Sequence, residues 1–176
     1  MHILILPMYY PEPGAPPHRG YMFYEQAMQI ARSGYRVGLA YTEQRLPKEF
    51  TWKTFCKENH FQITEEDNGT FITLRMHAWN PKLSTRAGGF IWSLLTLLLV
   101  RGYIRRYGKP DIIHAHFGTW AGYAANLVYK CYGIPYVITE HASSINGGKV
   151  TPGQAATLRA AYKNAQKVIC VGTLLK

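Results

Sequence analysis

The stretch from Pro110 to His141 constrains the fold more than any other part of this 176-residue chain. It predicts a strand, a helix and a second strand, over residues 111–115, 119–132 and 136–139. Gly133 supplies the left-handed residue at which such a helix commonly ends. Both predicted strands are continuously apolar, which is typical of parallel strands buried on both faces. The stretch therefore indicates a strand–helix–strand crossover within a parallel sheet.

Polar side chains fall at the carboxyl ends of these two strands. His114 and His116 close the first strand, and Glu140 and His141 close the second. Ligands of open parallel sheets bind outside the carboxyl ends of the strands, so we expect all four residues at one ligand-binding edge. His114 is interpreted as a buried, hydrogen-bonded strand residue. His141 begins a loop, where packing does not require a histidine, and is the strongest candidate for function.

The rest of the sequence continues the alternation of strands and helices. Further strands are predicted over 2–6, 37–41 and 167–171, and further helices over 21–32, 90–107 and 152–164. The N-terminal residues are interpreted as the first strand, because they are too short and carry no basic leader for a signal peptide. We expect residues 1–176 to form one α/β domain, a doubly wound Rossmann-like parallel sheet of five or more strands.

One segment, residues 43–82, departs from this rhythm. Residues 51–57 suit a short helix or an insertion, and Asn68-Gly69 is a strong turn signal between two β-rich runs. We expect a β-hairpin insertion on one side of the sheet, followed by a polar loop over 77–89.

Composition limits the class of protein. A hydrophobic fraction of 47% excludes a disordered chain. The three cysteines are odd in number and far apart, which is weak support for zinc or a disulfide framework and suits a reducing cytoplasm. Cys170 lies in an apolar strand without a local base and is expected in the core.

The formal net charge of +10 indicates anionic partners. The basic residues form no stripe interleaved with exposed aromatics, so no nucleic-acid partner is expected. One local cluster, containing Arg101, Arg105 and Arg106, follows the apolar run 88–100, which is shorter than the ~18 residues that suggest a membrane span. Two interpretations stay open for this helix: a core helix covering the sheet, and an interfacial helix whose arginines meet anionic headgroups.

A proline- and glycine-rich loop precedes the helix at residue 21. It contains Gly14, His18, Arg19 and Gly20. Glycines allow close backbone approach to a ligand, and the following helix N-terminus favours a phosphate. The loop matches neither a GxGxxG nor a P-loop fingerprint. It is longer than most strand-to-helix connections, which favours a binding role over a plain connection.

The His-x-His pair of residues 114 and 116 leaves a second class of enzyme open. Such a pair can bind a metal ion, with Glu140 and His141 as further ligands, in a metal-dependent hydrolase. A non-enzymatic alternative is a stand-alone sugar- or phosphate-binding module.

Four motifs together resemble a known family: GYMFYEQAMQIARSGYRV, PDIIHAHF, GIPYVITEH and AQKVICVG. In this order they resemble the N-terminal domain of family-four glycosyltransferases, retaining enzymes with two facing Rossmann-like domains in the GT-B architecture. The resemblance implies transfer of a hexosyl group from a nucleotide sugar to a saccharide or lipid-linked acceptor. It implies no metal and no cofactor beyond the nucleotide sugar as co-substrate.

The resemblance also implies what this chain lacks. Family members bind the nucleotide sugar mainly through a C-terminal domain with an E-x7-E motif, which is expected to be absent from this sequence. The chain would then be the acceptor half, inactive alone. The implied function is in polysaccharide or cell-envelope biosynthesis, in the cytoplasm or peripherally at the inner face of an anionic membrane.

Residue roles follow from the resemblance position by position. His141 would lie beside the transferred sugar, and Glu140 would orient it or contact acceptor hydroxyls. His116 would face the acceptor cleft. The glycine loop ending at Gly20 would border the donor diphosphate and the acceptor pocket.

Overall fold

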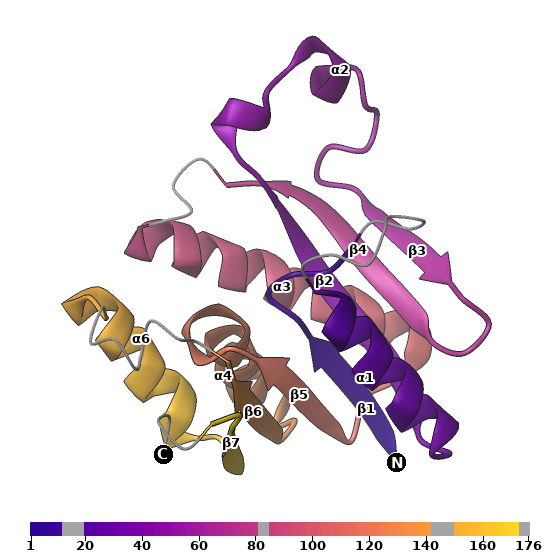
Figure 1. Ribbon diagram of the computed structural model, residues 1–176, viewed down its shortest axis with the longest axis vertical. Helices are drawn as coiled ribbons and strands as arrows, with labels where there is room; N and C mark the ends of the chain where they lie inside the picture. The colour runs from indigo at the N-terminus through magenta and orange to yellow at the C-terminus, as the bar shows by residue number, and fades with distance from the viewer. Residues whose placement is uncertain (12–19, 81–84, 142–149, 173–176) are drawn as a thin grey trace.

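The computed structural model describes residues 1–11, 20–80, 85–141 and 150–172 (Figure 1). The strands are β1 (His2–Leu6), β2 (Arg36–Arg45), β3 (Ile63–Asp67), β4 (Ile72–Trp79), β5 (Ile112–His116), β6 (Tyr136–Glu140) and β7 (Lys167–Cys170). The helices are α1 (Tyr21–Arg32), α2 (Trp52–Phe55), α3 (Arg86–Tyr107), α4 (Tyr123–Tyr132) and α6 (Pro152–Lys163), with a 3-10 turn η1 (Pro47–Glu49) and a π-helical turn η2 (Gly118–Gly122).

All of these strands form a 7-stranded sheet in the order β3-β4-β2-β1-β5-β6-β7. Neighbouring strands are parallel, with the exception of the β3–β4 pair. The direction of the strand order reverses at β1, which is the signature of a doubly wound sheet. The predicted fold class, an α/β Rossmann-like sheet with a hairpin, is confirmed.

The helices divide unequally between the two faces of the sheet (Figure 1). On one face α1 buries Phe23 and Ala27, and Ala27 packs with apolar side chains of β1 and β2. On the other face α3, α4 and α6 enclose a larger apolar core with the sheet. Trp92 of α3 is buried there, and its indole N–H donates to the backbone oxygen of Thr42 in β2 at 2.9 Å. We call these the α1 face and the three-helix face.

The expected hairpin is formed by β3 and β4 and extends the sheet at one edge. The two strands β3 and β4 pair antiparallel, as Asn68-Gly69 predicts, but β4 also pairs in parallel with β2. The predicted loop over 77–89 is wrong at both ends, because β4 continues to Trp79 and α3 begins at Arg86. The strand extends to Trp79 because its backbone hydrogen-bonds to β2 over that length. The polarity of the individual residues did not indicate this pairing.

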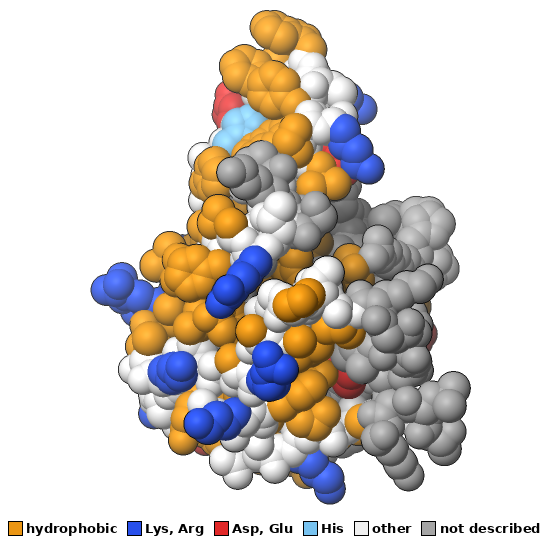
Figure 2. Space-filling model, turned by 90° about the vertical axis from the view of Figure 1, so that its left-hand side faces the viewer, with side chains coloured by type: hydrophobic (Ala, Val, Ile, Leu, Met, Phe, Trp, Pro, Cys, Tyr) orange, Lys and Arg blue, Asp and Glu red, His pale blue; other side chains and the backbone are white. Residues whose placement is uncertain are grey.

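Cys170 lies on β7, the last strand in the sheet order, and is half-buried rather than in the core. Of the two interpretations of residues 51–57, the short helix is correct, and it is α2 over Trp52–Phe55. Together η1 and α2 form a projection at one end of the sheet, and hydrophobic side chains gather on it in Figure 2. Phe50, Trp52 and Phe55 are all exposed there.

Helix α3 is longer than the apolar run that predicted it. It has 22 residues, and among the described residues it is the one helix long and apolar enough to cross a membrane, with a mean hydropathy of 1.5 in its most apolar window. Leu99, Val100 and Tyr103 are buried against the sheet, as the core-helix interpretation requires. The same helix also leaves several large apolar side chains exposed.

Candidate functional site

The carboxyl edge of the sheet brings three histidines together on the α1 face. His114 and His116 come from β5, and His141 follows β6 directly. Their ring centroids lie 4.4 Å apart for His114 and His116 and 5.4 Å apart for His116 and His141. His116 Nδ1 and His141 Nε2 form a hydrogen bond of 3.1 Å. The sequence-based prediction that these residues share one edge is correct.

The three histidines differ in how much of each side chain a ligand can reach. His114 is buried, and its Nε2 bonds the Thr139 hydroxyl at 2.7 Å, which fits the structural role expected for it. His116 is completely buried behind His141, and its Nε2 has no hydrogen-bond partner among the described residues. His141 is only partly buried. His141 is therefore the member of the cluster that faces outward.

Aromatic side chains hold this cluster against α1. The ring of Phe23 lies 4.5 Å from that of His116 and 5.6 Å from that of His141, centroid to centroid. Phe117, at the end of β5, packs 5.2 Å from His141. Phe117 has φ 73° and ψ 131°, a positive-φ conformation that is uncommon outside glycine and often found at functional sites. The histidines thus sit in a rigid, largely apolar setting.

Burial keeps the inner histidines neutral. It lowers the pKa of His114 to about 4 and that of His116 to about 2, and the neighbouring histidines lower both values further. Burial also lowers the pKa of His141, although the adjacent Glu140 opposes that shift. At neutral pH the cluster offers uncharged imidazoles, which can donate or accept hydrogen bonds in a fixed geometry.

Glu140 points away from the histidine cluster, because successive strand residues face opposite sides of a sheet. Its carboxylate lies on the three-helix face, where the residue is 3% exposed. It accepts hydrogen bonds from the Gly118 N–H at 2.8 Å and the Tyr162 hydroxyl at 2.6 Å. It also accepts one from the backbone N–H of His141 at 3.1 Å. The geometry does not expose Glu140 for contact with acceptor hydroxyls; its role in orienting His141 stays a prediction.

Gly20 is the described member of the predicted ligand-binding loop, since Gly14, His18 and Arg19 lie outside the described residues. It precedes α1 with φ 95°, in the left-handed region. A Cβ at this position would lie 2.7 Å from the backbone oxygen of Tyr9, so only glycine fits. This turn places the start of α1 at the carboxyl edge, on the same face as Phe23 and the histidines. A contact of Gly20 with substrate stays a prediction.

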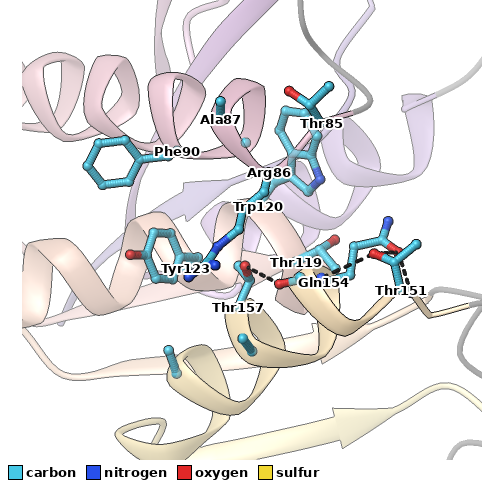
Figure 3. Close-up of a pocket in the computed structure, with 14 residues that line it drawn as sticks. Thr85, Arg86, Ala87, Phe90, Thr119, Trp120, Tyr123, Thr151, Gln154 and Thr157 are labelled. Atoms are coloured by element: carbon cyan, nitrogen blue, oxygen red, sulfur yellow. Dashed lines mark hydrogen bonds between the residues drawn. The ribbon is translucent and has the colours of Figure 1, made fainter.

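A cavity of about 650 Å³ opens on the three-helix face of the same edge (Figure 3). Side chains from the beginnings of three helical segments line it: Thr85, Arg86, Ala87, Gly89 and Phe90 of α3 and its cap, Thr119, Trp120 and Tyr123 of η2 and α4, and Thr151, Gly153, Gln154, Ala156, Thr157 and Ala160 of α6 and its cap. The sequence-based reasoning missed this cavity. The Thr151-Pro152 capping pattern with Gln154 signals where α6 begins, but not that α3 lies opposite.

The metal-hydrolase alternative depends on further ligands around His114 and His116. No group of three or more His, Cys, Asp or Glu side chains that could hold a metal ion occurs in the part of the chain that the structure describes. In particular, the Glu140 carboxylate bonds Gly118 and Tyr162 on the other side of the sheet.

The fold of this chain is similar to about half of each of several solved GT-B glycosyltransferases. A structure of Arabidopsis thaliana UGT89C1 complexed with UDP-L-rhamnose aligns with a TM-score of 0.54 at 16% identity, covering 97% of this chain and 42% of that one. An α,α-trehalose-phosphate synthase (UDP-forming) from Burkholderia xenovorans, in complex with glucose-6-phosphate, aligns with a TM-score of 0.59 at 10% identity, covering 96% and 40%. At such identities the likeness shows the fold. This chain spans about 40% of each of those chains.

The sequence assigns the family. The profile of Glycosyltransferase Family 4 matches residues 20–176, so this chain belongs to that family. A putative teichuronic acid biosynthesis glycosyltransferase of Bacillus subtilis, TuaC, is 51% identical over 37 residues, which is 21% of this chain and 10% of the relative. The expected relationship to family-four glycosyltransferases is therefore confirmed.

Proposed function

We propose that this chain is the acceptor-side domain of a retaining glycosyltransferase. It acts with a separate nucleotide-sugar-binding domain to move a hexosyl group onto a saccharide or lipid-linked acceptor of the cell envelope. Family membership supports the reaction class. UDP and UDP-L-rhamnose in the UGT89C1 structures support a nucleotide-sugar donor. The observation that carries the proposal is the outward-facing His141, held by the buried His116 at the carboxyl edge.

In this proposal the residues of the edge position the reactants. The departing diphosphate takes the proton of the acceptor hydroxyl as the new C–O bond forms on the same face of the sugar, so no protein base is required. His141 makes a neutral hydrogen bond to a sugar hydroxyl near the reaction centre. His116, which is buried, acts as a positioning residue that fixes the His141 ring. Fixed geometry of this kind lowers the barrier by orientation and preorganised hydrogen bonding.

Replacing His141 by alanine tests this proposal. In an enzyme that joins this chain to its donor-binding domain, we expect His141→Ala to reduce sugar transfer at least about tenfold, equal to about 1.4 kcal/mol in the barrier. The measurement is transfer of radiolabelled sugar from a nucleotide-sugar donor. As a matched control, His60→Ala removes a histidine from the segment between α2 and β3 and should leave transfer unchanged. Wild-type turnover in the His141 variant would overturn the assigned role.

We also propose that α3 contacts anionic membrane lipids. Phe90, Ile91, Leu94 and Leu98 are 48%, 41%, 39% and 53% exposed and lie at helical spacing along one side of α3. The exposed Arg101 and Arg105 lie on the same side of α3, one and two helical turns beyond Leu98. An apolar strip that ends in basic residues suits a helix lying in a lipid interface. Such contact would hold the domain at the membrane surface, where a lipid-linked acceptor would lie.

Vesicle co-sedimentation tests the membrane contact. Each basic residue at an anionic surface contributes about 1 kcal/mol. We therefore expect Arg101→Gln with Arg105→Gln to weaken binding to phosphatidylglycerol vesicles by about thirtyfold. Arg106→Gln is the matched control, because its guanidinium already lies 3.6 Å from the Glu65 carboxylate. Equal binding of the double variant and the wild type, or loss only on replacing Trp52 of the projection, would contradict this placement.

A further inference from the structure

The cavity on the three-helix face is separate from the histidine cluster. The two lie on opposite faces of the sheet, and none of the three histidines lines the cavity. Its volume of about 650 Å³ falls within the range of small-molecule sites. The side chains that shape it identify the chemistry of a ligand.

Two aromatic rings form fixed apolar walls. Trp120 and Tyr123 project into the cavity from η2 and the start of α4 (Figure 3). The Trp120 indole packs edge-on against the buried Trp92, with ring centroids 5.9 Å apart. It also lies over Gly89, where a Cβ would come within 3.8 Å of the ring. A supported aromatic face beside hydroxyl groups suits a sugar ring, which has apolar C–H faces and a polar rim.

Gln154 and Thr119 offer hydrogen-bond donors to the cavity. The side-chain oxygen of Gln154 accepts a hydrogen bond from the Thr151 N–H at 2.9 Å. The amide nitrogen of Gln154 therefore points away from Thr151. Among the described residues, neither that amide nitrogen nor the Thr119 hydroxyl has a hydrogen-bond partner. Figure 3 shows Gln154 and Thr119 at the same end of the cavity. A ligand rich in acceptor oxygens would satisfy both groups.

Arg86 gives the cavity its charge. It is the single charged side chain among the described residues that line it. Its side chain runs from the first turn of α3 past Trp120 toward Tyr123 (Figure 3). Its stem passes over Gly153, where a Cβ would lie 3.5 Å from Arg86 Cδ. No carboxylate among the described residues lies within 4.0 Å of its guanidinium, so its five donors remain for a ligand.

We propose that this cavity binds a sugar that carries an anionic group, a carboxylate or a phosphate. The sugar ring lies on Trp120 and Tyr123, and the anion meets the Arg86 guanidinium. Charge-assisted, bidentate pairing is the geometry in which arginine recognises both kinds of anion. The beginnings of α3 and α6 at the cavity add a smaller positive potential. The inference rests on the proposed function in one respect: the sugar would be a unit of the acceptor.

Glu140 connects this cavity to the reaction edge. Gly118 begins η2, which carries Thr119 and Trp120, and its N–H is bonded to the Glu140 carboxylate. The Tyr162 hydroxyl ties α6 to the same oxygen. Two walls of the cavity are therefore anchored to the residue that precedes His141. In this proposal an acceptor chain passes around the carboxyl edge of the sheet, with an acidic unit in the cavity and its reacting hydroxyl near His141.

Binding of three matched sugars to the 176-residue chain tests the inference. Glucose, glucuronate and glucose 1-phosphate share one ring and differ in charge. Indole N–H resonances of the four tryptophans provide the readout, with Trp120→Phe identifying the signal of the cavity. We expect both anionic sugars to bind at least about tenfold more tightly than glucose and to shift the Trp120 signal. Tighter binding of glucuronate alone, or of glucose 1-phosphate alone, would identify the anion as a carboxylate or a phosphate.

Two arginine variants separate this cavity from general attraction to a basic protein. Arg86→Gln should remove the preference for the anionic sugars and leave glucose binding unchanged. Arg159→Gln, an identical change on an exposed residue of α6 outside the cavity, should alter nothing. Equal binding of charged and neutral sugars would overturn the inference. So would anion binding that survives Arg86→Gln but is lost in His141→Ala, because the anion would then lie at the histidine cluster.

These outcomes are distinct from failure of the proposed function. Sugar transfer that is unaffected by His141→Ala, with anion binding intact at Arg86, would reject the catalytic assignment and keep the cavity. If His141→Ala reduces transfer as expected but no anion binds at Arg86, the catalytic assignment is kept and the cavity inference is rejected.

Discussion

Replacing Glu140 by alanine is expected to lower the free energy of unfolding by about 3 kcal/mol, because three donors would lose their acceptor inside the protein. These donors are the backbone N–H groups of Gly118 and His141 and the hydroxyl of Tyr162. The loss is measurable by chemical denaturation followed by circular dichroism. The variant should also weaken ligand binding in the cavity, since η2 and α6 share this anchor.

Three variants test whether the carboxylate acts as that anchor. In Glu140→Gln the amide oxygen can still accept from Gly118 and Tyr162, so the expected loss is about 1 kcal/mol. Tyr162→Phe removes one donor and should cost a similar amount. Glu25→Ala, the same change at an exposed position of α1, should leave stability within about 0.5 kcal/mol of the wild type. A Glu140→Ala variant as stable as Glu25→Ala would contradict the anchoring role.

Acid is expected to destabilise the protein through the buried histidines. The folded-state pKa values of His114 and His116 lie at about 4 and about 2, below the ordinary value of 6.5. Below pH 6.5 the unfolded chain therefore binds protons that the folded chain does not, and stability falls as the pH falls. Between pH 6.5 and pH 5 the two histidines together should remove about 3 kcal/mol from the free energy of unfolding.

Replacing one histidine isolates this contribution from that of the carboxylates. His116→Asn keeps a hydrogen-bonding atom near the position of Nδ1 and does not titrate. Its free energy of unfolding should fall less steeply between pH 6.5 and pH 5, by about 1 kcal/mol per pH unit, than that of the wild type. Denaturation curves at several pH values give both slopes. Parallel slopes would show that His116 titrates alike in the folded and unfolded chain.

Much of the fold follows from local sequence patterns. The apolar run before His114, the helix stop at Gly133 and the turn at Asn68-Gly69 each depend on a few neighbouring residues, and each predicted the correct element. The placement of β4 beside β2 does not depend on such signals. It depends on β2, which pairs with β1 along one edge and with β4 along the other. Sequence patterns within 43–82 do not indicate which strand β4 will join.

The site was predictable where it depends on strand ends. His116 and His141 meet because parallel strands end at one edge. Side chains alternate between the two faces along a strand, so Glu140 points to the face opposite His141. This alternation alone predicts that the two side chains do not share a face. The cavity around Arg86 and Trp120 was not predictable in this way. It requires α3 and α6, distant in sequence, to begin at facing positions.

At the end of β6, neighbouring residues point to opposite faces of the sheet. Thr139 and His141 face the α1 side, and Glu140 between them faces the three-helix side, where it bonds Gly118. A change in the length of this strand by a single residue would exchange the two sides. The imidazole would enter the wall built on Gly118 and Tyr162, and the carboxylate would enter the histidine cluster. The spacing of Thr139, Glu140 and His141 along the backbone therefore matters as much as their chemical identity, and this segment should tolerate substitutions better than insertions or deletions.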